Sequence, residues 1–140
     1  MPADPFDLER FVEAQDAVVD KVLAELRQGR KTSHWMWFVF PQIAGLGMSA
    51  MSQRYAISSL GEARAYLDHP VLGSRLRDCV GILLGVTGGS AHDIFGSPDD
   101  RKLHSSLTLF QQAAPDEPLF RQALERYFGG EPDRATLERL

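Results

Sequence analysis

The stretch TSHWMWFVFPQIAGLGMSAMSQRY, residues 32–55, contains both tryptophans of this 140-residue chain. Within it, residues 35–40 form the longest unbroken apolar run of the sequence. Pro41, Gly45 and Gly47 follow this run, and residues of these types are typical of turns and loops. We therefore predict an aromatic segment that enters the core, followed by an irregular loop.

The apolar run WMWFVF has the composition of a β-strand but lacks a partner. No second strand-like segment is present, and a buried strand without a neighbour would leave its backbone N–H and C=O groups unsatisfied. A short helix over residues 34–39 is the better interpretation. Ser33 would cap its start, and Pro41 would end it, because proline disfavours helix at the residue before it.

Apolar residues at helical spacing cover most of the remaining chain. The clearest pattern, over residues 7–28, predicts one long amphipathic helix. Capping signals predict the starts of later helices at Ser59, Ser90, Ser97–Pro98 and Asp133. Since no β-pattern occurs and the connections are rich in proline and glycine, we predict an all-α fold, a compact irregular globule of about six to seven helices. Its length favours a single domain over residues 1–140.

The composition narrows the classes of function. A net charge of −4 argues against a nucleic-acid partner, because such binding requires lysine and arginine side chains to neutralise phosphates. The single cysteine, Cys79, lies in an apolar helical pattern and is expected to be buried, as suits a reducing compartment. No secretory signal and no apolar run of about 18 residues are found. We therefore expect a cytoplasmic protein with no membrane partner and an oligomeric state that the sequence leaves open.

The histidines and acidic pairs give no pattern of metal ligands. The four histidines are His34, His69, His92 and His104, and their spacing matches no metal-binding motif. The neighbouring carboxylates of Asp99–Asp100 diverge if they lie on a helix. The sequence therefore predicts no metal and no cofactor.

The aromatic block, residues 35–40, allows two interpretations. In the first it is core, because aromatic side chains bury large areas and tryptophan needs one hydrogen-bond partner for its indole N–H. In the second it forms the floor of a pocket, because aromatic faces with a few convergent polar groups are typical of small-molecule sites. The polar rim of that pocket would be His34, Gln42 and Tyr55.

Two further segments could carry chemistry. The backbone of Gly45–Ser49 could direct N–H groups at an anion, although a plain turn is the better explanation. Asp99, Lys102 and Ser106 share one face of a predicted helix, where the lysine could activate a hydroxyl or could simply pair with the aspartate in solvent. Small hydroxyl side chains at Ser105 and Thr108 leave room for another group to approach this helix.

The functional hypothesis is a small-molecule site where residues 33–55 meet residues 99–108. We assign catalytic roles to His34, as acid/base or hydrogen-bond partner, and to Lys102, as anion partner. The remaining candidate ligand-binding residues are Ser33, Trp35, Trp37, Gln42, Arg54, Tyr55, Asp99 and Ser106. The alternative is a non-enzymatic protein-interaction module that uses exposed parts of the aromatic block.

Long blocks of the sequence resemble a bacterial domain-of-unknown-function family, whose members genome annotation sometimes mislabels as calpastatin. The blocks include GRKTSHWMWFVFPQIAGLG, YAISSLGEARAYLDHPVLGSRL and IFGSPDDRKLHSSLTLF. The resemblance spans about Leu8 to Leu140 and implies a compact, mainly helical domain without an established activity.

A fainter resemblance links the chain to the helical NADAR domains of NAD and ADP-ribose metabolism. It rests on Ser33–His34–Trp35 and on Lys102–Leu103. The chain has His34 where those domains would have a glutamate, so the resemblance implies a class of ligand, of the nucleotide or ADP-ribose kind, and no shared reaction.

Overall fold

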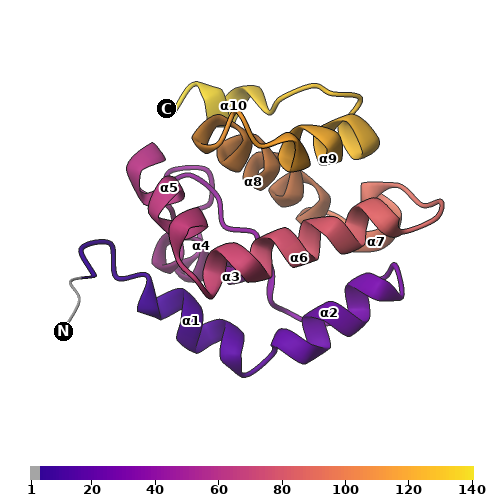
Figure 1. Ribbon diagram of the computed structural model, residues 1–140, viewed down its shortest axis with the longest axis horizontal. Coiled ribbons are helices and arrows are strands. Elements are labelled where there is room, and N and C mark those ends of the chain that lie inside the picture. Colours follow the sequence, from indigo (N-terminus) through magenta and orange to yellow (C-terminus); the bar gives the residue numbers. More distant parts are fainter. Residues whose placement is uncertain (1–3) are drawn as a thin grey trace.

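The computed structural model describes residues 4–140, and its regular structure in that range is helical (Figure 1). Six helices have eight or more residues and four have only four or five, so the prediction of six to seven helices undercounts the short ones. The helices are α1 (Glu9–Asp16), α2 (Val19–Arg27), α3 (Met36–Val39), α4 (Ala50–Arg54), α5 (Leu60–Asp68), α6 (Leu72–Gly85), α7 (Ala91–Phe95), α8 (Asp99–Ala113), α9 (Pro118–Phe128) and α10 (Arg134–Leu137).

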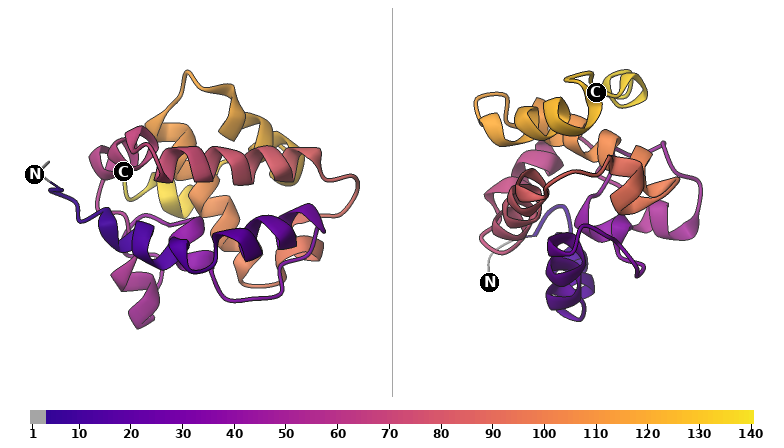
Figure 2. Two further views of the ribbon diagram at one scale, coloured as in Figure 1. Left: turned by 60° about the horizontal axis from the view of Figure 1, so that its bottom comes forward. Right: turned by 90° about the vertical axis from the view of Figure 1, so that its right-hand side faces the viewer.

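Helix α8 lies at the centre of the fold. It packs against α5, α7, α9 and α10, and residues 105–110 within it are all buried. Helices α1 and α2 lie on the opposite side of α6 from α9 (Figures 1 and 2). The first turn of α8 lies at the edge of this core, where its charged residues remain partly exposed.

The prediction of one helix over residues 7–28 is wrong. The chain breaks at Ala17–Val18, where Val18 leaves the helical region with φ −130° and ψ −3°. The break allows α1 to pack on α3 and α2 to pack on α6. Just before it, the buried Gln15 side chain donates to the carbonyl oxygen of Phe38 and to the hydroxyl of Tyr66. The two halves of the predicted helix thus pack on different helices, which local periodicity does not encode.

The aromatic block enters the core as the first interpretation predicted. Trp35 is fully buried and Phe38 and Phe40 nearly so, while Trp37 stays partly exposed. The short helix is also present, but Ser33 does not cap it. Helix α3 begins after Trp35 without a side-chain cap, because the Ser33 hydroxyl donates instead to Glu25 of α2.

The other capping signals place the helix starts correctly. Ser59 accepts from the Glu62 N–H, Ser90 forms a capping box with Asp93, and Asp133 accepts from the Thr136 N–H. These bonds join residues three positions apart, so the backbone geometry of a helix start brings their atoms together.

Candidate functional site

A hollow of about 290 Å³ lies between the segment leading into α3 and the first turn of α8. It is therefore formed by parts of the two segments that the hypothesis joined. Its lining residues are Lys31, His34, Trp35, Met36, Trp37, Pro98, Asp99 and Lys102. Five of these, His34, Trp35, Trp37, Asp99 and Lys102, are among the residues selected from the sequence.

One carboxylate serves two lysines at this hollow. Asp99 Oδ2 lies 2.8 Å from Lys31 Nζ, and its Oδ1 lies 3.7 Å from Lys102 Nζ. Only 8% of the Lys31 side chain is exposed, against 21% for Lys102. One aspartate can neutralise one lysine, so the group carries a spare positive charge, and the more exposed Lys102 is the better placed to offer it to an anion.

Each lysine also lies over a tryptophan ring. Lys31 Nζ is 5.1 Å from the centre of the Trp35 ring, and Lys102 Nζ is 5.2 Å from that of Trp37. Both distances allow cation–π attraction. Because Trp35 is fully buried and Trp37 is not, Trp37 provides the aromatic surface that a ligand could reach. His34 is exposed at the rim.

A buried carboxylate stands behind the hollow. Glu25 accepts hydrogen bonds from the backbone N–H groups of Thr32 (2.7 Å) and Ser33 (2.9 Å), from the Ser33 hydroxyl, and from Trp35 Nε1 (3.1 Å). Burial opposes ionisation of Glu25, but together these four donors outweigh it and lower its pKa to about 2. Glu25 is therefore a carboxylate at neutral pH, held by the segment that lines the hollow.

The other predicted site residues do not line this hollow. Tyr55 is buried against Phe11 and Phe38, and the Arg54 guanidinium lies 5.5 Å from the centre of the Tyr55 ring. Ser33 binds Glu25 as described. The remaining two, Gln42 and Ser106, lie elsewhere.

Gln42 lines a separate hollow of about 300 Å³ formed by the glycine-containing loop and α4. Ser106 is fully buried in α8 with no hydrogen-bond partner for its hydroxyl in residues 4–140. It lies about two helical turns beyond Asp99, roughly 10 Å along the axis, so the shared helix face does not bring it to the hollow.

The small hydroxyls of α8 have a different role from the one the sequence suggested. The group that approaches them is the C-terminal segment of the same chain. Asp133 accepts from the Ser105 hydroxyl at 3.0 Å, and its N–H donates to Thr108 Oγ1 at 2.9 Å. Ser105 and Thr108 therefore fasten the start of α10 to α8.

Sequence reasoning missed Glu25 and Lys31. Glu25 had a detectable signal, because it lies between Val22 and Leu26 on the apolar face of its helix, where a charge needs a partner. Lys31 had none, because it follows Arg27 and Arg30 and reads as one more charge near a helix end. Only the folded chain places it against Asp99.

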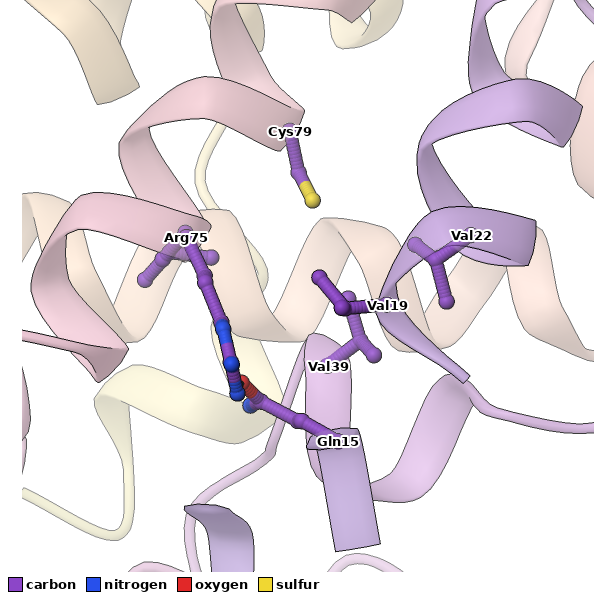
Figure 3. Close-up of a pocket in the computed structure, with 7 residues that line it drawn as sticks. Gln15, Val19, Val22, Val39, Arg75 and Cys79 are labelled. Atoms are coloured by element: carbon purple, nitrogen blue, oxygen red, sulfur yellow. The ribbon is translucent and has the colours of Figure 1, made fainter. Parts of the chain in front are cut away.

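A small cavity of about 10 Å³ lies where α1, α2, α3 and α6 meet (Figure 3). Gln15, Arg75 and Cys79 converge on it in the close-up, with Val19 and Val22 from α2. Its volume is at the lower limit for one water molecule. Burial raises the pKa of the Cys79 thiol to about 12, so this thiol is a buried apolar group and not a nucleophile.

Metal-binding clusters and membrane-spanning helices are both absent from the described part of the chain. Residues 4–140 contain no group of three or more His, Cys, Asp or Glu side chains placed to hold a metal ion. None of the helices in this range is long and apolar enough to cross a membrane.

The fold and the hollow define an all-helical domain with a lysine-rich, tryptophan-lined depression between two segments distant in sequence. The chain belongs to the family described as protein of unknown function (DUF1810), whose model matches residues 5–140. It is similar to the crystal structure of the conserved hypothetical protein Rv1873 from Mycobacterium tuberculosis, with 55% identity, a TM-score of 0.96 and 98% of each chain covered. No curated protein is significantly similar to it.

Proposed function

We propose that this domain binds a small anionic metabolite with a planar ring, of the nucleotide or ADP-ribose kind, in the hollow between residues 31–37 and 98–102. The observation that carries the proposal is the sharing of Asp99 by Lys31 and Lys102 beside two tryptophan rings. Two lysines and a single carboxylate, Asp99, are the charged side chains that line the hollow.

The volume supports a ligand of this size. Sites for small molecules typically measure about 300–1,000 Å³, and this hollow of about 290 Å³ lies just below the lower limit of that range. A mononucleotide, or one half of a dinucleotide, suits it better than a larger molecule.

The chemistry of the lining assigns a role to each accessible group. Lys102 attracts the anionic group, and the partly exposed ring of Trp37 offers a face to a planar ring. His34 at the rim can donate a hydrogen bond or exchange a proton, since its ring is exposed beside the lysines.

The alternative, a protein-interaction module built on the aromatic block, has less support. The exposed large apolar side chains of residues 4–140 are Met48, Leu137 and Leu140, and none of them belongs to residues 35–40. An interaction surface made of that block would need its side chains outside the core.

The test is a thermal-shift screen with ADP-ribose, NAD, AMP and inorganic phosphate, followed by Lys102→Ala and His34→Ala. A ligand at about 100 times its Kd stabilises the folded state by about 2.7 kcal/mol, which raises the melting temperature by several degrees. The matched control is Lys21→Ala, because Lys21 is an exposed lysine of α2 outside the hollow.

Loss of the shift in Lys102→Ala, with retention in Lys21→Ala, would support the site. No shift with any of the four probes, or equal shifts in both lysine variants, would refute it. Intrinsic fluorescence gives a second readout, because both tryptophans of the chain line the hollow.

A further inference from the structure

We propose that Glu25 is a positioning residue for the hollow: its buried carboxylate holds residues 31–35 in the conformation that presents Lys31, His34 and Trp35. The inference rests on the proposed function and adds to it a residue that does not itself line the site.

The geometry shows how one side chain can shape the whole segment. Between the end of α2 and the start of α3, the chain turns so that two consecutive N–H groups, one hydroxyl and one indole N–H all point at Glu25. These donors belong to Thr32, Ser33 and Trp35. Trp35 itself lines the hollow, and Thr32 and Ser33 lie between Lys31 and His34, which also line it. Helix α3 begins directly afterwards without any side-chain cap of its own.

The partners of Glu25 make it hard to replace. Within residues 4–140 no lysine or arginine forms an ion pair with it, so its charge is stabilised by these hydrogen bonds. A carboxylate has two accepting oxygens, whereas an amide has one and presents N–H groups on its other side. Glu25→Gln therefore sets donors against donors in the segment while it preserves the size of the side chain.

Trp35 connects this carboxylate to the hollow. Its indole N–H donates to Glu25, while Lys31 Nζ lies over its ring and also pairs with Asp99 of α8. The contacts thus run from α2 through residues 31–35 to the first turn of α8. Movement of the Trp35 ring would displace Lys31 relative to Asp99 and Lys102.

The experiment compares Glu25→Gln with Glu62→Gln. Glu62 is also buried and also accepts an N–H and a hydroxyl from one serine, Ser58, but it is bound to Arg10, and neither of these partners lines the hollow. Ser33→Ala removes a single donor to Glu25 and tests the same interaction if Glu25→Gln fails to fold.

The first readout needs no ligand. Tryptophan emission and quenching by neutral acrylamide and by anionic iodide report on Trp35 and Trp37 alone, since the chain has no other tryptophan. We expect Glu25→Gln to shift the emission to the red and to make Trp35 accessible to acrylamide. Quenching by iodide, which the two lysines attract to the tryptophans, should fall relative to quenching by acrylamide. Ser33→Ala should move these signals the same way by less, and Glu62→Gln should leave them at wild-type values.

The second readout is the affinity for ADP-ribose. We expect about tenfold weaker binding in Glu25→Gln, because the displaced segment no longer presents Lys31, His34 and Trp35 to the ligand, and unchanged binding in Glu62→Gln. Wild-type emission and quenching in Glu25→Gln and Ser33→Ala would overturn the positioning role, as would equal affinity in Glu25→Gln and wild type. If ADP-ribose does not bind the wild type, that choice of ligand fails, and the quenching experiment still decides the role of Glu25.

Discussion

The two buried glutamates of this fold, Glu25 in α2 and Glu62 in α5, are stabilised by different kinds of partner. Each accepts the N–H and the hydroxyl of a serine in a neighbouring loop, Ser33 or Ser58. Glu62 also forms an ion pair with Arg10 at 2.9 Å. Glu25 instead accepts further hydrogen bonds from the Thr32 N–H and the Trp35 indole N–H.

The difference determines how much of each loop depends on the carboxylate. A cation neutralises Glu62 directly, so the loop at Ser58 contributes only one residue. Glu25 has no cation beside it and requires hydrogen-bond donors from Thr32, Ser33 and Trp35. The positions of these three residues are therefore fixed by the need to stabilise a buried charge. The Glu25 arrangement lies directly behind the lysine-rich hollow, whereas the Glu62 arrangement does not contact it.

The largest expected effect on stability is that of Glu62→Ala. It leaves the Arg10 guanidinium, whose side chain is 16% exposed, without its buried partner. Breaking a buried pair in this way costs about 3–5 kcal/mol, measured by urea denaturation. The native tryptophan emission should not change, because the hollow is built without Glu62. A loss below about 1 kcal/mol would mean that the pair is worth no more than a surface ion pair.

Acid should weaken the Glu25 arrangement specifically. The folded pKa of about 2 lies below the ordinary value of 4.5, so the stabilisation is complete above pH 4.5 and is lost as the pH falls from there through about 2. Allowing for solvent screening, the loss is on the order of 2 kcal/mol.

Urea denaturation at pH 7, 4.5 and 3 measures this loss. Glu25→Gln is the control, since it removes the titrating group and should flatten that part of the profile. An identical pH dependence in wild type and Glu25→Gln would assign the acid sensitivity to other carboxylates.

Asp133→Ala provides a milder, less buried counterpart to both glutamates. Asp133 accepts from the Ser105 hydroxyl and from the N–H and hydroxyl of Thr136, so its removal uncaps α10 and loosens it from α8. We expect a loss of about 1–2 kcal/mol and faster amide exchange confined to residues 133–140. Accelerated exchange at residues 31–35 would show that the attachment of α10 also supports the segment that lines the hollow.

The smallest effect, and the only stabilising one, is expected for Gly81→Ala. Gly81 lies in the interior of α6, and a Cβ there would meet no atom within 4 Å. Replacement should add about 0.5–1 kcal/mol, because glycine is a poor helix former. The melting temperature measures the gain, and a decrease would reveal a packing constraint that the structure does not show. A stabilised Gly81→Ala background would also keep Glu25 and Glu62 variants folded for comparison.

Sequence reasoning succeeded where interactions are local. The starts of α5, α7 and α10 were predicted from Ser59, Ser90 and Asp133, because the capping atoms lie only three residues apart. It failed at Ala17–Val18, where the helical pattern continues but the two halves pack on different helices.

The candidate site shows the same division. Residues 33–55 were expected to meet residues 99–108, but only residues 34–37 of the first segment and Asp99 and Lys102 of the second line the hollow. Arg54 and Tyr55, at the far end of the first segment, do not line the hollow: Arg54 is exposed to solvent and Tyr55 is buried in the core.

The sequence by itself determined the helical class and the ends of most helices, since these follow from periodicity and capping, while for the aromatic block it left core and pocket floor as alternatives. Only the tertiary structure decided that Ser33 serves Glu25 and not α3, and that Lys31 reaches Asp99. The physical reason is that a buried charge takes the donors which packing brings within reach, and that choice depends on helices far apart in the chain.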